Sequence, residues 1–415
     1  MLKTPSDKTL DSTLPFARDG YLFVTKRCDR YRTDLFQTRL LLRKSICMRG
    51  EDAARLFYDE GRFERSGVAP VRVQETLFGR GGVQGSDGAA HRWRKEMFLS
   101  LMSAQAISRL GELSAMQWRA YAAKWEEQEQ IVLLDEACEI LCRAVCEWAG
   151  VPLAELEVTK RARDFAAMID AGAAIGLRHW RGRWARNRAE KWIGGIVEDV
   201  RNHRLAPDEG SALHMIAFHR DRQGQLLNER IAAVELINVL RPTVAVAWYV
   251  TFAALALHQY PECRQRIAAA QEGYLECFVQ EVRRFYPFFP VVAARTRHEF
   301  EWKGYRLPGR TRVLLDLYGT DHDTRLWDRP DAFVPERFRH WDGSAFNFIP
   351  QGGGSHRNGH RCPGEWITIE LMKVAAEFLS ARIQYEVSQQ DLRISLSRIP
   401  ALPNSRFLIR NVRQI

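Results

Sequence analysis

FNFIPQGGGSHRNGHRCPGE, residues 346–365, is a glycine-rich, basic segment that ends in one cysteine, Cys362, followed by Pro363-Gly364. Apolar residues then recur with helical spacing at positions 367, 371, 374, 375, 378 and 379. The thiol is therefore expected at the start of a helix. There the helix dipole, His360 and Arg361 provide positive potential, which favours the thiolate, the form that binds a metal.

This segment has three other interpretations. A single cysteine before a helix is most often a small buried apolar residue. A zinc site would use His356, His360 and Cys362, but their i, i+4, i+6 spacing is unusual for zinc and the chain has no CxxC pair. A phosphate-binding loop would end in Gly-Lys-Ser/Thr, which this segment lacks.

The segment resembles the cysteine-ligand loop of the cytochrome P-450 superfamily, in which His or Arg precedes the cysteine by two residues and Gly follows it by two. His360, Cys362 and Gly364 match this pattern. Asn358 and Ser355 differ from it, because the usual loop has glycine four residues before the cysteine and an aromatic residue further upstream. The resemblance implies that Cys362 is the proximal thiolate ligand of a haem b and that His360 is a propionate partner.

The chain as a whole shows no sign of a domain boundary. Its 415 residues are 46% hydrophobic, enough for a sizeable core, and contain no repeat, low-complexity tract or Pro/Ser-rich linker. We expect a single domain over residues 1–415. Residues 1–20 contain no apolar run typical of a signal peptide or membrane anchor, so we expect a soluble, cytoplasmic protein.

The net charge of +10 is distributed with mixed signs along the chain. The basic cluster Arg178–Arg188 is interpreted as a solvated helix face and not as a nucleic-acid site, because no recognition motif accompanies it. Of the eight cysteines, Cys138, Cys142 and Cys146 stand at i, i+4, i+8. This spacing predicts a packing stripe of small residues, since a disulfide or a metal cluster requires another geometry.

Two basic residues stand four positions apart on a helix expected to open near Ala89. His91 and Lys95 share one face of this helix and are placed to hold a carboxylate jointly, with surface charge as the other interpretation. In the P-450 superfamily the corresponding helix bears an aromatic residue or His followed four residues later by a basic residue. The resemblance implies that His91 and Lys95 contact the haem propionates, with Arg65 as a further partner.

The longest apolar segment, residues 229–258, is predicted to form the central buried helix of the protein. The apolar run after Pro242 is too short to span a bilayer, and Arg241 interrupts the remainder. A buried, unpaired guanidinium is costly, so Arg241 requires an anion that its helical neighbours do not supply. That anion is either a remote Asp or Glu of the chain or an anionic ligand. Pro242 is expected to kink the helix at this point.

Further along the chain, Glu281 and Arg284 stand at i, i+3 on a predicted helix, and Pro335-Glu336-Arg337-Phe338 follows short strand-like runs. Together with the Cys362 loop, their order and spacing resemble the P-450 pattern over nearly the whole chain. The resemblance implies that Glu281, Arg284 and Arg337 form a buried ion network behind the haem. It also implies a mainly α fold, the cytochrome P-450 fold, with a long central helix over the haem and a small β region.

The central helix departs from the usual monooxygenase pattern, which carries an acid–Thr pair where this chain has Arg241 and Pro242. Thr243 stands one residue late. With Gln84 in a Gly-Val-Gln-Gly loop, this pattern resembles the bacterial fatty-acid peroxygenases, which use hydrogen peroxide and require no redox-partner protein. The resemblance implies catalytic roles for Arg241, Pro242 and Gln84. It also implies a long-chain fatty acid whose carboxylate binds Arg241 and serves as general acid–base.

A carboxylate held at Arg241 places Cα and Cβ nearest the reacting centre, so we expect 2-hydroxylation, with 3-hydroxylation or decarboxylation to a terminal alkene as the outcomes at Cβ. Hydroxylation is expected to dominate, because Gln84 cannot donate a proton as a histidinium does. The predicted walls of the alkyl channel, with ordinary core packing as the other interpretation, are Phe78, Ile169, Phe288 and Phe289. Two other functions stay open: a conventional monooxygenase that uses a redox partner, and a non-catalytic haem or fatty-acid sensor.

Overall fold

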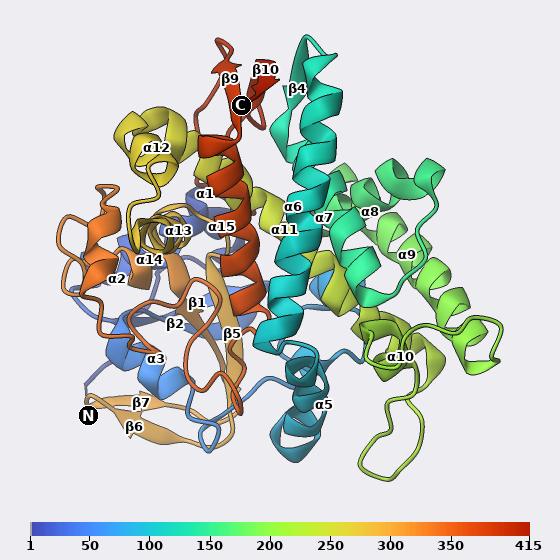
Figure 1. Ribbon diagram of the computed structural model, residues 1–415. Helices are drawn as coiled ribbons and strands as arrows, with labels where there is room; N and C mark the ends of the chain where they lie inside the picture. Colours follow the sequence, from blue (N-terminus) through green and yellow to red (C-terminus); the bar gives the residue numbers. More distant parts are fainter. Residues whose placement is uncertain (1) are drawn as a thin grey trace.

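The computed structural model describes residues 2–415 and shows a mainly helical protein with a small β region, which confirms the predicted fold class (Figure 1). The long helices pack together, and the five-stranded sheet lies to one side of them (Figure 1). The α-helices are α1 Thr13–Asp19, α2 Phe23–Tyr31, α3 Glu51–Phe57, α4 Val71–Val73, α5 Gly88–Ser100, α6 Ala104–Glu126, α7 Leu133–Ala149, α8 Val158–Asp170, α9 Leu177–Arg201, α10 Ala212–Ala217, α11 Glu229–Gln259, α12 Pro261–Ala268, α13 Tyr274–Phe285, α14 Leu317–Asp321 and α15 Glu365–Ala381.

Five shorter helical turns lie between these helices and the strands. One of them, η2, is a π-helical turn, and the other four are 3₁₀ turns. Their bounds are η1 Gly20–Leu22, η2 Gln74–Phe78, η3 Val83–Gly85, η4 Glu155–Glu157 and η5 Pro335–Arg339.

The β region consists of three small sheets. The five-stranded sheet has the order β1-β2-β8-β5-β3, in which β2 and β8 are parallel and the other neighbours antiparallel. A three-stranded sheet has the order β4-β10-β9, and β6 and β7 form a hairpin. The strands are β1 Leu35–Leu40, β2 Arg43–Met48, β3 Phe63–Glu64, β4 Gln130–Val132, β5 Val291–Thr296, β6 Phe300–Trp302, β7 Tyr305–Leu307, β8 Arg312–Asp316, β9 Ile383–Val387 and β10 Leu408–Gln414.

The central helix α11 lies inside the helical part, as residues 229–258 predicted. It packs against α7, α8, α9 and α15, so its apolar side chains are covered on all sides. Of the part of the chain that the structure describes, α11 alone has the length and composition of a membrane span, and 94% of its most apolar window is buried in the protein. It is therefore a core helix of the fold. The helix is continuous through Pro242.

The cysteine stripe of α7 faces this core. Cys138, Cys142 and Cys146 are buried and not paired in disulfides, and they lie in the same hydrophobic cluster as the apolar residues of α11. This placement confirms the predicted packing stripe. Small side chains at these positions allow α7 and α11 to approach closely.

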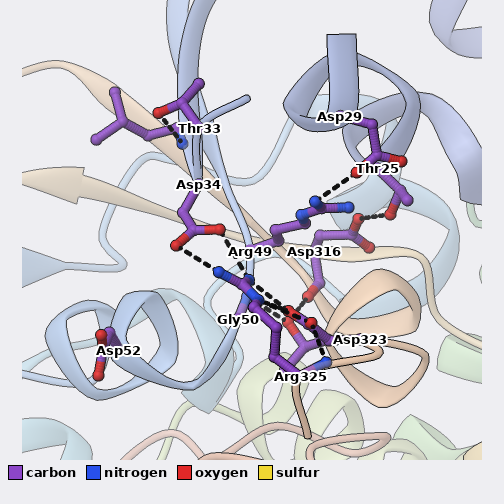
Figure 2. Close-up of polar contacts among 12 residues, drawn as sticks. Thr25, Asp29, Thr33, Asp34, Arg49, Gly50, Asp52, Asp316, Asp323 and Arg325 are labelled. Atoms are coloured by element: carbon purple, nitrogen blue, oxygen red, sulfur yellow. Dashed lines mark hydrogen bonds and ion pairs between the residues drawn. The ribbon is translucent and has the colours of Figure 1, made fainter. Parts of the chain in front are cut away.

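A polar cluster joins the N-terminal helices and strands to the segment after β8 (Figure 2). Arg325 donates to Asp34 at 2.8 Å and also binds Asp323, while the Thr25 hydroxyl donates to the Asp316 carboxylate at 2.9 Å. Asp316 also accepts the backbone N–H of Gly319 at 2.8 Å, which caps α14. Because Asp316 is fully buried, desolvation raises its pKa to about 7.

Asp316→Asn should change how stability depends on pH. The pKa of Asp316 is near 4 in the unfolded chain and about 7 in the folded one, so folding is favoured where the group is protonated. Its contribution is lost as pH rises from about 4 to about 7 and stays lost above that. The neutral Asn should therefore raise the free energy of unfolding at pH 8 by up to about 4 kcal/mol, since one pKa unit corresponds to about 1.4 kcal/mol. Denaturant titrations at pH 5 and pH 8 measure this; an equal effect at both pH values would contradict it.

Candidate active site

The Cys362 loop leads into the start of α15. Cys362 lies two residues before Gly364, which is the N-cap of that helix. Gly352 and Gly354 have φ of +90° and +76°, and a Cβ at Gly354 would lie 2.9 Å from Cβ of Tyr58. Glycine is therefore required where the loop turns over the Tyr58 ring. The backbone N–H of Cys362 donates to the carbonyl of Gln351 at 3.2 Å, which fixes the thiol at the loop end.

The start of α15 and nearby cations favour the Cys362 thiolate, in line with the prediction, but burial of the sulfur opposes it. Desolvation raises the pKa of the Cys362 thiol, and the Glu365 carboxylate raises it further. The Gly364 N–H, Lys95 and Arg283 act in the opposite direction but do not outweigh burial. A metal ion bound to the sulfur would supply the missing stabilisation of the thiolate.

A buried polar network under Cys362 was not predicted from the sequence. Glu365 is 2% exposed; it forms ion pairs with Arg283 and, at 2.6 Å, with Arg361. Arg283 also donates to Gln351 Oε1 at 3.0 Å, and Gln351 Nε2 lies 3.8 Å from Cys362 Sγ. The network fixes both the start of α15 and the loop that carries the thiol.

The predicted propionate partners gather on the other side of the loop. Lys95 Nζ donates to the carbonyl of Gly359 and, at 2.8 Å, to that of Arg361. The rings of His91 and His360 stack with centroids 3.9 Å apart. The three predicted residues of this group are thus brought together around the Cys362 loop, and their role toward propionates stays a prediction.

The titration of this group is controlled by burial. Desolvation lowers the pKa of Lys95 to about 8 and that of His91 to about 3, and the neighbouring His360 and Lys95 lower His91 further. Desolvation also lowers the pKa of His360, although its ring lies 3.5 Å from Asp87. At neutral pH His91 is therefore neutral.

Asp87 is a residue of this region that the sequence did not identify. Its carboxylate accepts the backbone N–H groups of Arg65 and Ser66, each at 2.8 Å, and the pKa of Asp87 lies below its usual range because of these bonds and His360. Arg65 donates to the carbonyl of Ala293 at 2.8 Å and lies 4.1 Å above the Phe57 ring. Arg65 is thus held near the group around His360, as expected of a further propionate partner.

Arg241 is buried in α11, and its guanidinium is not neutralised. It is 5% exposed, and within residues 2–415 it makes no side-chain hydrogen bond or ion pair; its Nε is buried without any partner. Desolvation lowers the pKa of Arg241 to about 9, the nearby cation of Arg186 lowers it further, and the thiol of Cys362 raises it. The remote Asp or Glu that was the alternative partner is not found among the described residues.

A polar chain beside Arg241 connects Gln84 to the protein surface. Glu235, one turn and a half before Arg241, accepts from Arg94 and from Asn238 Nδ2, both at 3.0 Å. Asn238 Nδ2 also lies 3.3 Å from Gln84 Oε1. Glu235 is thus committed to other partners, and Gln84 is held on the face of α11 that carries Pro242 one turn later.

The predicted channel residues differ in their surroundings. Ile169 and Phe288 are buried, and the Phe288 ring packs 4.9 Å from that of Tyr249. Phe78 ends the π-helical turn η2 and is partly buried. Phe289 packs against Phe288 with centroids 4.7 Å apart but is 37% exposed, which is more than an enclosed channel wall would show. Their contact with a substrate stays a prediction.

Glu281, Arg284 and Arg337 form a buried ion network. Arg284 binds both carboxylate oxygens of Glu281, at 2.7 and 2.8 Å, and Arg337 Nε lies 3.1 Å from the same carboxylate. The side chains of Glu281 and Arg284 are fully buried. Arg284 also donates to the carbonyls of Asp321 and Pro330, each at 3.0 Å, so the network ties α13 to the end of α14 and to the segment that follows it.

These residues fit a haem-thiolate site. One cysteine at a helix start supplies the sulfur ligand, the basic group around His360 suits carboxylates on one side, and the orphaned Arg241 Nε marks a second anion position. This set of residues defines the protein as a candidate haem-thiolate protein.

Solved CYP152 structures are 46–48% identical to this chain over nearly its whole length, so the chain belongs to the cytochrome P450 family, in the branch of the CYP152 peroxygenases, and is an oxidoreductase. The family model "Cytochrome P450" matches residues 268–399. Among curated proteins, "Rhazimal synthase" of Alstonia scholaris is 32% identical over 213 residues; the match covers 44% of this chain and only 42% of that enzyme.

Solved structures match over the whole chain. "Cytochrome P450SP alpha (CYP152B1) mutant R241E" is 48% identical with a TM-score of 0.96, covering 98% of this chain and 99% of that one. "Cytochrome P450EX alpha (CYP152N1) wild-type with myristic acid" is 46% identical with a TM-score of 0.97, covering both chains fully at 100%. Cytochrome P450 OleT in complex with arachidonic acid is 35% identical with a TM-score of 0.97, covering 100% of this chain and 99% of that one.

Proposed function

We propose that this protein hydroxylates long-chain fatty acids at Cα with hydrogen peroxide as oxidant. The observation that carries the proposal is the buried guanidinium of Arg241, which has no anionic partner among residues 2–415. A charge left in this state is costly, and a substrate carboxylate would neutralise it through charge-assisted, bidentate hydrogen bonds. The binding site therefore selects substrates that carry a carboxylate.

The same carboxylate would act as the general acid–base of the reaction. The hydroxyl of Thr243 donates to the carbonyl of Val239 at 2.9 Å, and Glu235 is bound to Arg94 and Asn238. No free acid of the described chain is therefore placed beside Arg241. A carboxylate at Arg241 can take a proton from peroxide and return it to the departing oxygen.

Cys362 would hold the haem through its thiolate, and His91, Lys95, His360 and Arg65 would bind its propionates. When bound, a thiolate-ligated haem supplies the oxidising chemistry that breaks the O–O bond of peroxide. Because Arg241 fixes the carboxylate, Cα and Cβ are the substrate atoms nearest the reacting centre. We therefore propose oxidation mainly at Cα, with Cβ hydroxylation or decarboxylation as minor outcomes, and Gln84 as a distal residue that influences their ratio.

The structural neighbours support a fatty-acid substrate. One was solved with myristic acid and another with arachidonic acid. A further neighbour carries the substitution R241E, and this chain has arginine at its own position 241. The two named ligands are carboxylic acids, which supports the proposal that Arg241 binds a carboxylate.

The test uses the purified haem-loaded protein with a long-chain fatty acid and product identification by mass spectrometry. With hydrogen peroxide alone we expect 2-hydroxy acid as the main product. Turnover with a reductase and NADPH but none with peroxide would identify a conventional monooxygenase. A shift of the haem spectrum on fatty-acid binding without turnover would identify a sensor, and mainly terminal alkene would contradict the proposed position of oxidation.

A further inference from the structure

The outward face of α9 and the loop before it expose large apolar side chains. Ile175 is 72% exposed, Leu177 81%, Trp180 47% and Trp184 55%. We call these four residues the α9 patch. Leu177, Trp180 and Trp184 stand at i, i+3, i+7, so they lie on one side of the helix. The helix lies at the periphery of the helical part (Figure 1).

The opposite side of α9 is the one that packs against the protein. Gly182 and Ala185 lie on the opposite side of α9 and are buried. A Cβ at Gly182 would lie 2.2 Å from Cβ of Ala171, so this side is in close contact with the end of α8. The α9 patch is thus the side of the helix that the fold leaves uncovered.

Most arginines of α9 are paired with acids: Arg178 with Asp170, Arg183 with Glu75 and Arg188 with Asp164. Glu190 is partly buried and forms ion pairs with Arg186 at 2.7 Å and Arg230 at 3.4 Å. Arg181 and Lys191 are exposed and have no ion-pair partner in the described chain. The α9 patch is therefore bordered by two unpaired positive charges, those of Arg181 and Lys191, which are available to bind an anionic surface.

We propose that the α9 patch, with Arg181 and Lys191, is a peripheral docking surface for an anionic lipid bilayer. Tryptophan prefers the boundary between headgroups and acyl chains, and arginine or lysine beside it binds anionic headgroups. The face is a helix surface in which aromatic and basic side chains alternate, which suits a flat lipid boundary. Nucleic acid is disfavoured because the exposed apolar side chains would remain in water. This inference stands on surface residues and does not depend on the proposed substrate.

The experiment measures binding of the holoenzyme to vesicles of phosphatidylglycerol and phosphatidylcholine, against vesicles of phosphatidylcholine alone. We expect co-sedimentation with the anionic vesicles that weakens as salt is raised, and quenching of tryptophan fluorescence by brominated lipids. Trp180→Ser/Trp184→Ser and Arg181→Glu/Lys191→Glu should each reduce vesicle affinity at least about tenfold, since the first removes the apolar area that enters the lipid boundary and the second reverses two charges that attract anionic headgroups. In the Trp variant the brominated-lipid quenching should also be lost.

Leu156→Ser is the matched control. Leu156 is 97% exposed but lies between Glu155 and Glu157, outside the patch, and its replacement should leave vesicle binding unchanged. Far-UV circular dichroism and the haem absorbance spectrum verify that each variant is folded, independently of the proposed activity. No binding to anionic vesicles, equal binding by all variants, or a wild-type dimer that Trp180→Ser/Trp184→Ser dissociates without any vesicle binding would each overturn the proposal.

Discussion

Arg241→Ala should lose at least about 30-fold in kcat/KM for peroxide-driven fatty-acid hydroxylation, since truncating one partner of a buried, hydrogen-bonded charge pair costs about 2–5 kcal/mol or more. In the proposed mechanism the loss has two sources. The fatty acid loses its ion pair, and its carboxylate is no longer held where it moves the peroxide proton. Initial rates over a range of fatty-acid concentrations, with haem content verified by absorbance, measure the effect.

Stability and rescue separate this mechanism from a folding defect. Arg241 has no partner within residues 2–415, so Arg241→Ala removes a buried unpaired charge and should not lower the free energy of unfolding. Arg241→Lys keeps the charge but not the bidentate geometry and should retain part of the activity. In the wild type, acetate should permit oxidation of a substrate without a carboxyl group, and in Arg241→Ala it should not. Full activity of Arg241→Ala would refute the substrate-assisted mechanism.

Glu281→Gln should lower the free energy of unfolding by about 3–5 kcal/mol, because removing one member of a buried ion network leaves the other charges uncompensated. Glu281 is fully buried and neutralises Arg284, with Arg337 as its second partner. The carbonyl groups that Arg284 also contacts provide no countercharge. Denaturant-induced unfolding followed by far-UV circular dichroism measures the difference.

Glu336→Gln is the matched control, because Glu336 directly precedes Arg337 of the network but is not part of it. Glu336 forms an ion pair with Arg266, but the two side chains are 42% and 30% exposed. An exposed pair contributes about 1 kcal/mol or less, so this variant should unfold almost as the wild type does. Equal destabilisation by both substitutions would show that burial of the Glu281 network does not determine its effect.

Local sequence signals predicted the parts of the site whose chemistry is carried within one segment. Three features can be recognised within one continuous segment of sequence. They are the Cys362 loop, the apolar length of α11 and the unusual Arg241-Pro242 pair. The mainly α fold followed from the helical periodicity and from the resemblance. The glutamate and arginines at 281, 284 and 337 were predictable because the family pattern joins two distant segments.

Contacts between distant segments were not predictable in the same way. Asp87 and Arg283 are ordinary polar residues in the sequence. Only the fold brings Asp87 to His360, and Arg283 of α13 to Gln351 and Glu365 of the Cys362 segment. The positive charge near Cys362 is visible in the sequence, whereas the desolvation that raises the pKa of its thiol depends on the whole fold. The exposure of the Phe289 side chain was likewise not predictable, because it depends on which segments pack around it in the fold.

The Thr243 hydroxyl is occupied by the Val239 carbonyl, and this bond has a consequence for oxidant use. A protein that lacks its own proton donor at the oxidant position should leave hydrogen peroxide unreacted while no acid is bound. Arrival of the lipid would then start consumption of the oxidant and determine which molecule receives the oxygen. In the proposed function, this dependence on a bound acid would protect the haem from oxidative damage by peroxide when no fatty acid is present.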